Sequence, residues 1–576
     1  MKSFLKTLIA VLIAHLIALC VIVGIVAVKL SDDVKVEDGS ILILTLDGPI
    51  PDSSPPGGLP LPGTGGTTHT SIMENLEKAR HDDRIKGVVL KLGSPGAGFA
   101  KMGEWRERIR ALRDSGKPVW AHTNWLGRGG LYLGGICDSL FMLPSGYVSL
   151  RGFASGRYYF KGTLEKLGVS ENLHRIEHYK AMAEMVQRDR MSETSRANTE
   201  WMLDTYYPHY LETVEGEREL PPGTLEGQVF SEGTLVPQEA LELGLVDRLL
   251  YWDEVESMLL AVDGVKERKR KGDAPPRPRT ISGCDYAQVD RSDAGIKAKK
   301  KIAVVHAMGL IAGEESSTNP LIGRTLGART MSEAFRAAAE DEDIAAILYR
   351  VDTGGGESAA SWRIQRAALQ AAEIKPMVVS VGDVAASGGY TICYPCESLV
   401  ASRLSVVGSI GSISGKFNLR GLLNKLGITM DFVTRGPNAL MESDYYDYTA
   451  DQWASFKERH WRDYHEWVDD IAHARGRTPA EIDSVGRGRV WTGEQALEHG
   501  LIDRIGSFDE AVRLLKEKAE IPAEEEVEYV HYPREKGLLE ALRTDGIGAA
   551  VQALVHQMLA PVAREGTWAI DWNDYH

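Results

Sequence analysis

The chain has 576 residues, of which 43% are hydrophobic and 26% are charged, a composition typical of folded proteins. At about 150 residues per domain, this length predicts three or four domain-sized pieces or two large ones. The formal net charge of -15 provides no basic field that would collect phosphates, which excludes nucleic acid as a main partner.

The first element in the chain is an apolar stretch long enough to span a membrane. Residues 8–28 contain no charged side chain, and at the helical rise they cover about 30 Å. Lys2 and Lys6 precede the stretch, which favours an N-terminus in the cytoplasm. A cleaved secretory signal is the alternative, but the stretch is longer than a usual signal core and no small-residue cleavage site follows it. We therefore predict an uncleaved transmembrane anchor over residues 1–30, with the rest of the chain outside the cytoplasm.

Three stretches of the chain return in the same order further along it. The paired stretches are separated by 259, 259 and 256 residues, and they are 83–92 with 342–351, 137–140 with 396–399, and 239–249 with 495–505. Repetition at nearly one spacing indicates a tandem duplication. We predict an N-terminal repeat over residues 31–262 and a C-terminal repeat over residues 301–520.

The segment between the repeats, residues 263–300, is basic and rich in proline. It includes the run VKERKRKGDAPPRPR, from Val265 to Arg279. Its prolines and its lack of apolar periodicity favour a solvated linker over an arm that binds nucleic acid. The tail, residues 521–576, shows no pattern that assigns it.

Within the C-terminal repeat, short runs rich in β-branched residues alternate with helical stretches. Strands are predicted at KIAVVHAMG, IAAILYRV and PMVVSVG, with helices at TMSEAFRAAAEDED and SAASWRIQRAALQAAE between them. Continuous apolar strands between helices of this length indicate a parallel or mostly parallel sheet covered on both faces. The predicted fold class is therefore α/β in each repeat.

A single C-x-x-C pair, Cys393 and Cys396, lies in the C-terminal repeat. One such pair without a second pair or histidines at ligand spacing is weak grounds for zinc, so we predict no metal site. A local disulfide is the alternative in an oxidising compartment. We interpret the pair as two small helix residues that face a core.

The stretch VGDVAASGGY, from Val381 to Tyr390, carries one serine among alanines and glycines. Ser387 is predicted at a helix start, where free N–H groups and the helix dipole favour negative charge, and the N–H of Gly388 is a natural oxyanion donor. The alternative is an ordinary serine at a helix start. The glycine turn DTGGGE follows a strand end and lets backbone N–H groups approach a ligand. VGSIGS adds a second hydroxyl, Ser409, in a glycine setting.

A serine nucleophile needs a base, and the fifteen histidines show no pattern that selects one of them. No G-x-S-x-G elbow is present either. At the offset of 259 residues Ser387 falls on Arg128, so the first copy lacks the serine. A lysine is the alternative base.

With GDVAASGGY, GSIG, the strand-linked glycine turn and HYKAMAE, residues 1–520 resemble the long, duplicated signal peptide peptidase A family. These are membrane-anchored serine peptidases related in fold to the Clp protease and crotonase group. The resemblance implies that Ser387 is the nucleophile, that Lys180 of the N-terminal repeat is the base, and that Ser409 orients the lysine. Without the resemblance, Lys180 would be interpreted as a solvated surface lysine.

The resemblance also implies the setting of the enzyme. It predicts a tandem Clp/crotonase-like α/β fold behind one transmembrane helix, in the bacterial inner membrane with the catalytic part on the periplasmic side. It predicts a homotetramer, peptide substrates such as cleaved signal peptides, and neither metal nor organic cofactor.

The two copies can be compared at the base as well. Aligning YKA (179–181) with PNA (437–439) puts Asn438 opposite Lys180, so each repeat holds one half of the pair. The family commonly has a Ser-Pro-Gly-Gly type turn where this chain has TGGGE, with Gly354 at the proline position. We predict that Gly355 and Gly356 supply further oxyanion donors and that Glu357 points away.

The predicted reaction is acyl transfer to a serine. A lysine has an ordinary pKa of about 10.4, so burial between the repeats would have to lower it by several units for a base near neutrality. Two alternatives stay open: a crotonase-like enzyme that holds an acyl thioester without a covalent serine, and an inactive membrane scaffold.

Overall fold

The computed structural model describes residues 34–53, 67–176, 178–268, 275–319 and 323–534. The transmembrane anchor predicted over residues 1–30 lies outside this part of the chain. Among the described residues, no helix combines the length and the apolar character that crossing a bilayer requires.

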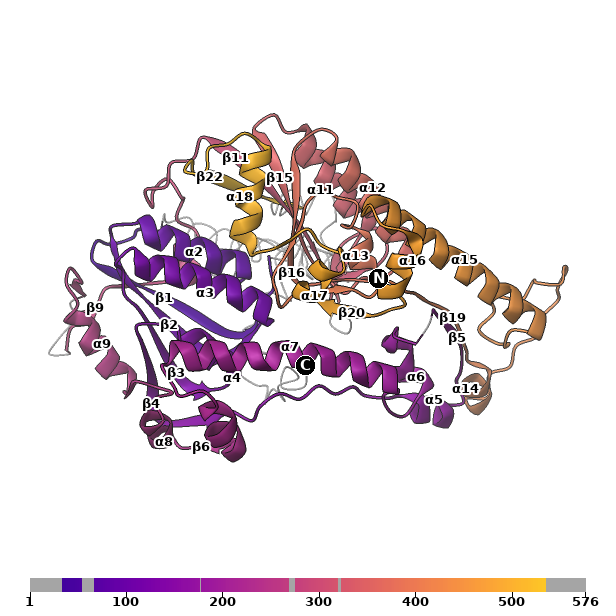
Figure 1. Ribbon diagram of the computed structural model, residues 1–576, viewed down its shortest axis with the longest axis horizontal. Coiled ribbons are helices and arrows are strands. Elements are labelled where there is room, and N and C mark those ends of the chain that lie inside the picture. Colours follow the sequence, from indigo (N-terminus) through magenta and orange to yellow (C-terminus); the bar gives the residue numbers. More distant parts are fainter. Residues whose placement is uncertain (1–33, 54–66, 177, 269–274, 320–322, 535–576) are drawn as a thin grey trace, which may run out of the picture.

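The N-terminal repeat is built on a seven-stranded sheet (Figure 1). Its central strands pair in parallel in chain order: β1 (Ser40–Pro49), β2 (Ile85–Gly96), β3 (Val119–Leu126) and β4 (Ser139–Ser149). The connections between them contain α2 (His69–His81), α3 (Phe99–Asp114) and α4 (Arg128–Gly134). Successive residues such as Ile41 and Leu42 are both buried, as expected for a parallel sheet covered on two faces.

The C-terminal repeat has the same plan on an eight-stranded sheet. Its parallel strands are β11 (Lys300–Met308), β15 (Ile344–Thr353), β16 (Met377–Ala386), β17 (Leu399–Ala401) and β18 (Val406–Gly408). The helices between them are α11 (Ala328–Glu340), α12 (Ser358–Ala372) and α13 (Gly388–Thr391). The predicted α/β class is confirmed in both repeats.

The two copies also share a polar contact that their sequences repeat. Arg218 donates to the carbonyl of Gly244 and to Asp247, whose carboxylate accepts the N–H of Leu140. The same three contacts recur with Arg475, the carbonyl of Gly500, Asp503 and the N–H of Leu399. Matching contacts at matching places are what a duplicated domain predicts.

The segments that follow the two repeats each supply an edge strand. β10 (Thr280–Ser282) pairs in parallel with β1, and β22 (Val527–Tyr532) pairs in parallel with β11. The solvated-linker interpretation is therefore wrong for the part of 263–300 that holds β10 and α10 (Gly283–Tyr286), where Tyr286 is fully buried. β10 has three residues, too few to show strand periodicity, so it could not be predicted from the sequence.

The repeats are joined by a strand from each. β5 (Ser170–Arg175) of the N-terminal repeat pairs antiparallel with β19 (Ile413–Asn418) of the C-terminal repeat. Figure 1 shows this pair between α7 (Glu193–Glu217) and α15 (Ala450–Ala474), the two long helices. The chain that follows β5 is thereby held against the C-terminal repeat.

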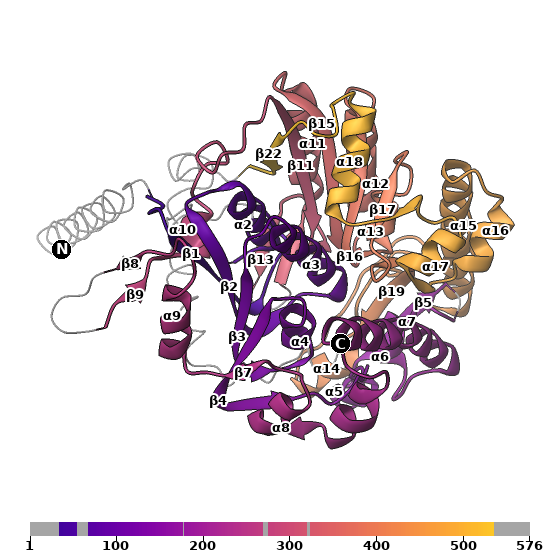
Figure 2. The same cartoon turned by 60° about the vertical axis from the view of Figure 1, so that its left-hand side comes forward.

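The sheets lie apart from each other, with α3 between them. In Figure 2 the strands β1 to β4 lie below β11 and β15, and α3 contacts β16. The first copy contacts the second at β5 and α3, and also along α7, where the Asn198 side chain exchanges hydrogen bonds with the backbone of Val490.

Candidate active site

Ser387 stands where β16 ends and α13 begins, as predicted. Its backbone dihedrals are φ 57° and ψ -123°, a region that a residue with a side chain rarely adopts. The N–H of Ser387 donates to the carbonyl of Gly408 at 2.8 Å, and its own carbonyl accepts the N–H groups of Tyr390 and Thr391 at 2.9 Å each. Backbone strain that the surroundings maintain is concentrated at functional sites. The strand-to-helix turn thus resembles a nucleophile elbow in geometry, although the G-x-S-x-G pattern is absent.

The glycine turn between β15 and α12 lies directly against this serine. A Cβ on Gly355 would come within 2.5 Å of the Gly388 nitrogen and 2.9 Å of the Ser387 Cβ. A Cβ on Gly388 would lie 3.1 Å from the nitrogen of Gly356. The three glycines predicted as oxyanion donors therefore converge on Ser387, and no larger residue fits at Gly355.

The three N–H groups differ in their availability. The N–H of Gly355 is occupied, because it donates to the Thr353 hydroxyl at 3.1 Å. Within the described part of the chain, the N–H groups of Gly356 and Gly388 have no such acceptor. The carboxylate of Glu357, which we expected to point away, accepts the N–H of Gly313 at 3.0 Å and is exposed. The geometry thus favours Gly356 and Gly388 as donors over Gly355.

Lys180 is brought to the C-terminal repeat by the chain that follows β5. The residue is only 7% exposed, and its Nζ donates to the Ser409 hydroxyl at 2.9 Å and to the Ser409 carbonyl at 3.0 Å. Burial lowers the pKa of Lys180 from 10.5 to about 7. A buried lysine with this pKa can be neutral near physiological pH, which a general base requires.

Gly488 of the C-terminal repeat holds the backbone of Lys180 in place. It has a φ of +86°, and a Cβ there would lie 2.5 Å from the nitrogen of Lys180. The next residue, Arg489, stacks on the ring of Tyr179 at 4.3 Å and donates to its hydroxyl at 3.2 Å. Sequence analysis missed both residues, since nothing in their local pattern links them to a lysine 308 positions earlier.

Ser409 connects the two halves of the site. Its neighbour Gly408 pairs with Ala386 in the β16–β18 ladder, and the Gly408 carbonyl accepts the Ser387 N–H. The hydroxyl and the carbonyl of Ser409 itself accept hydrogen bonds from the Lys180 ammonium. Ser409 also has a positive φ of 50°, and its N–H donates to the carbonyl of Arg489 at 2.6 Å. Among the described residues, no direct hydrogen bond joins Lys180 Nζ to the Ser387 hydroxyl.

The corresponding place in the first copy has no hydroxyl. α4 begins after Gly127, and Leu126 pairs with Val148 as Ala386 pairs with Gly408. By this register Ser387 corresponds to Gly127 and not, as we predicted, to Arg128. The difference arises because β16 has ten residues where β3 has eight, which shifts the simple offset.

The cysteine pair lies outside the site. Cys393 and Cys396 are both free and buried, and the Cys393 thiol donates to the Gly389 carbonyl at 3.3 Å. Their place in the core agrees with our interpretation, but α13 ends at Thr391, so the two cysteines are not the helix residues we predicted.

One group in the described part of the chain has metal-ligand geometry, namely Glu77, His81 and Glu526. The carboxylate of Glu77 is already shared by Arg80 and Arg108. This cluster is therefore an ion-pair network and a poor metal site.

Comparison with known proteins finds the same duplication. The model of peptidase family S49 matches residues 111–266 and again residues 369–522, so Lys180 falls in the first match and Ser387 in the second. The chloroplastic serine protease SPPA of Arabidopsis thaliana is 30% identical, over 90% of this chain and 74% of its own length. Protease 4 of Salmonella typhi is 34% identical over 78% of this chain and 72% of its own length. Protease 4 of Haemophilus influenzae is 28% identical over 76% of this chain and 71% of its own length.

Proposed function

The chain belongs to peptidase family S49 and is a serine peptidase, and we propose that Ser387 is its nucleophile and Lys180 its general base. One observation carries the proposal: the buried Lys180 ammonium binds Ser409, whose neighbour Gly408 holds the strained Ser387 backbone. No histidine takes part in these contacts.

The reaction follows from this arrangement. Neutral Lys180 accepts the hydroxyl proton of Ser387 as its Oγ attacks the peptide carbonyl carbon, and Ser409 keeps the lysine amine oriented. The oxyanion of the tetrahedral intermediate accepts the N–H groups of Gly356 and Gly388. Protonated Lys180 then gives its proton to the leaving amine, and a water molecule activated by Lys180 hydrolyses the acyl-enzyme.

The substrates we propose are peptides with small or apolar side chains, in particular signal peptides released in the membrane. The residues around Ser387, namely Ala385, Ala386, Gly388 and Gly389, carry neither charge nor bulk, which favours a substrate with small or apolar side chains. The apolar stretch at residues 8–28 would anchor the enzyme in the inner membrane with its catalytic part on the periplasmic side.

We also propose that the enzyme assembles into a homotetramer. Large apolar side chains from both repeats are exposed around α5 (Lys161–Leu167) and α14 (Arg420–Lys425); they are Tyr158, Phe160, Leu167, Met182, Leu426, Ile428, Met430 and Val433. An exposed apolar patch of this size favours association with another protein surface. Size-exclusion chromatography with light scattering tests this, and a monomer at micromolar concentration would contradict it.

A fluorophosphonate probe tests the nucleophile. The wild-type enzyme should be labelled, and Ser387→Ala should lose both the label and peptide hydrolysis. A crotonase-like thioester enzyme or an inactive scaffold would give no label that depends on Ser387. Lys180→Met should likewise abolish hydrolysis while leaving the fold intact, and retained hydrolysis would remove Lys180 as the base.

A further inference from the structure

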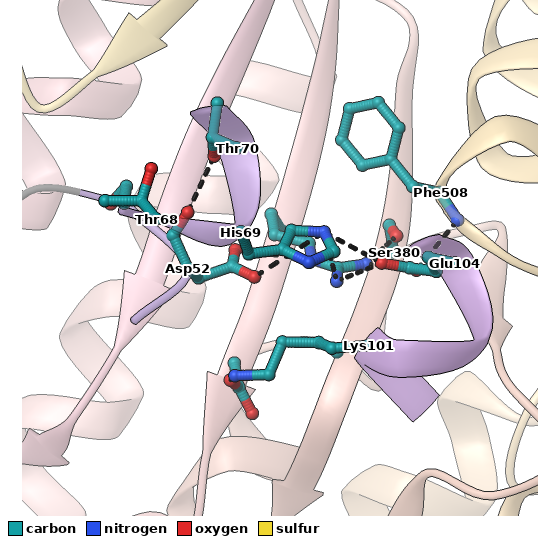
Figure 3. A network of polar contacts seen from close by, with 12 residues as sticks. Asp52, Thr68, His69, Thr70, Lys101, Glu104, Ser380 and Phe508 are labelled. Atoms are coloured by element: carbon teal, nitrogen blue, oxygen red, sulfur yellow. Dashed lines mark hydrogen bonds and ion pairs between the residues drawn. The ribbon is translucent and has the colours of Figure 1, made fainter. Parts of the chain in front are cut away.

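A cluster of buried charges lies where α3 of the N-terminal repeat meets the ends of β15 and β16. Lys101 and Glu104, one helical turn apart on α3, both reach into this junction (Figure 3). Glu104 pairs with Arg350 of β15 at 2.7 Å and with His69 at 2.9 Å. Lys101, Glu104, Arg350 and His69 are buried, and the carboxylates of Asp352 and Asp383 at the edge of the cluster are 13% and 19% exposed.

Lys101 joins two carboxylates of the C-terminal repeat. Its Nζ lies 2.8 Å from Asp352 Oδ2 and 3.1 Å from Asp383 Oδ2. Burial alone would lower the pKa of Lys101, but the two carboxylates raise it above its ordinary value. The ammonium is therefore charged at neutral pH, and it offsets the repulsion between two acids that lie close to each other.

Both carboxylates also fix backbone. Asp383 accepts the N–H of Gly98 at 2.9 Å and that of Lys101 at 3.2 Å, which caps the first turn of α3 from the other repeat. Asp352 accepts the N–H of Val384 at 3.1 Å and so ties the end of β15 to β16. A Cβ on Gly98 would lie 2.3 Å from Asp383 Oδ1, so the contact is closely fitted.

The two segments that Lys101 joins are the ones that carry the reaction. Asp352 opens the DTGGGE turn, three residues before Gly355, and Asp383 lies on β16, four residues before Ser387. The lysine itself belongs to the repeat that supplies Lys180. Lys101, from the repeat that supplies the proposed base, thus contacts Asp352 of the glycine turn and Asp383 of the strand that leads to Ser387.

The junction is specific to this pair of surfaces. At the offset of 259 residues, Lys101 corresponds to Ala360 and Asp352 corresponds to Gly93. The second copy cannot make the same contact with the first, because both partners of the charge pair are missing. The ion bridge therefore arose at one junction only, the one next to Ser387.

We propose that Lys101 is a positioning residue for peptide hydrolysis, which holds the glycine turn and the Ser387 strand in register with the repeat that delivers Lys180. This inference rests on the proposed roles of Ser387 and Lys180. A displacement of reacting groups by about 1 Å can lower a rate roughly 100-fold, so a buried contact at this place governs kcat.

Lys101→Met tests the proposal. We expect kcat for peptide hydrolysis to fall roughly 10- to 100-fold with KM little changed. Labelling of Ser387 by a fluorophosphonate should slow by a similar factor, since the probe needs the same serine and oxyanion geometry. Lys101→Arg keeps a cation between the two carboxylates and should restore most of the rate.

Lys78→Met is the matched control. Lys78 is also buried in the N-terminal repeat, but its Nζ donates to the carbonyls of Tyr286 and Val289 and contacts neither Asp352 nor Asp383. The Lys78→Met variant should have a lower melting temperature than the wild type, and the kcat of its folded fraction should be unchanged. If Lys101→Met fails to fold, Lys101→Met/Asp383→Asn removes one unpaired charge and should fold with the same kcat defect.

The proposal is overturned if Lys101→Met, or the folded double variant, keeps the wild-type kcat and labelling rate. It is also overturned if its kcat loss only matches the folded fraction, as for Lys78→Met. Ser387→Ala in the same assays distinguishes a failure of the proposed nucleophile from a failure of the positioning role of Lys101. If Ser387→Ala retains hydrolysis, the proposed nucleophile is wrong; if it is inactive while Lys101→Met is unaffected, only the positioning role is wrong.

Discussion

At the scale of single residues, the proposed base Lys180 should determine how activity depends on pH. Its pKa is lowered by burial to about 7, and only the neutral amine can accept the Ser387 proton. We expect kcat/KM to rise with pH as one group titrates near pH 7 and then to level off. A profile measured from pH 5 to 9 checks this, and a midpoint near 10 would contradict a buried lysine base.

The burial that makes Lys180 suitable as a base also lowers the stability of the folded protein at low and neutral pH. In the unfolded chain Lys180 stays protonated up to its ordinary pKa, while in the folded protein it loses its proton near pH 7. The folded state therefore disfavours the charged form below pH 7, and this cost fades as pH rises from 7 toward 10.5. Burying Lys180 thus lowers the free energy of unfolding, and the proposed role of its neutral amine as a base explains why a lysine is retained there.

Ser387 presents a similar conflict between stability and activity. Its φ of 57° and ψ of -123° suit glycine, and a strained residue of this kind costs roughly 1–3 kcal/mol. We expect Ser387→Gly to be inactive but to raise the free energy of unfolding by about 1 kcal/mol, after the entropy that glycine adds to the unfolded chain. Urea denaturation measures this. Ser387→Ala keeps the Cβ and should gain nothing, so equal stability of the two variants would argue against strain at this position.

At the scale of elements, the turn at Gly488 controls where the base stands. Gly488→Ala would place a Cβ 2.5 Å from the Lys180 nitrogen, in a backbone conformation that already costs a residue with a side chain roughly 1–2 kcal/mol. We expect a loss of kcat beyond the loss of stability. Gly436→Ala is the control, because its φ is +87° and a Cβ there meets nothing within 4 Å. Equal kcat in the two folded variants would mean that Lys180 tolerates the displacement.

Elements with a clear local pattern could be predicted from the sequence, and contacts between distant segments could not. The strands of β11, β15 and β16 and the helix start after Ser387 follow from apolar runs and small residues. Lys101 lies 251 positions from Asp352, and an ion pair between distant segments leaves no periodic trace in either. The roles of Lys180 and Ser387 came from a resemblance and from comparing the copies; the structure adds the contacts with Ser409 that place them near each other.

At the scale of the whole molecule, the junction between the repeats should be sensitive to acid. Burial would raise the pKa of Glu104, but Arg350 and His69 lower it from 4.5 to about 2. Because the folded pKa is depressed, Glu104 stabilises the protein fully above about pH 4.5, and this contribution is lost as pH falls toward 2. We expect Glu104→Gln to destabilise the protein at pH 7 by roughly 1.5–3 kcal/mol, since Arg350 loses the nearer of two buried carboxylate partners and keeps Asp52 at 3.4 Å.

Denaturant unfolding at several pH values between 3 and 7 measures this effect. The stability of Glu104→Gln should depend less on pH below 4.5 than that of the wild type. The control is Glu397, an exposed acid that pairs with Lys518. Glu397→Gln should leave the dependence of stability on pH below 4.5 as it is in the wild type. Identical pH dependence in wild type and Glu104→Gln would show that other acids dominate.

The division of the site between β5's repeat and β19's repeat has a consequence for how the enzyme is made. Residues 180, 387 and 409 belong to one site, so a ribosome must pass both copies before any of them can work together. A chain cut between the copies gives two pieces, a chain abandoned there gives one, and no such piece holds both Lys180 and Ser387. If the proposed site is right, peptidase activity therefore arises only after both copies have been synthesised and have folded against each other.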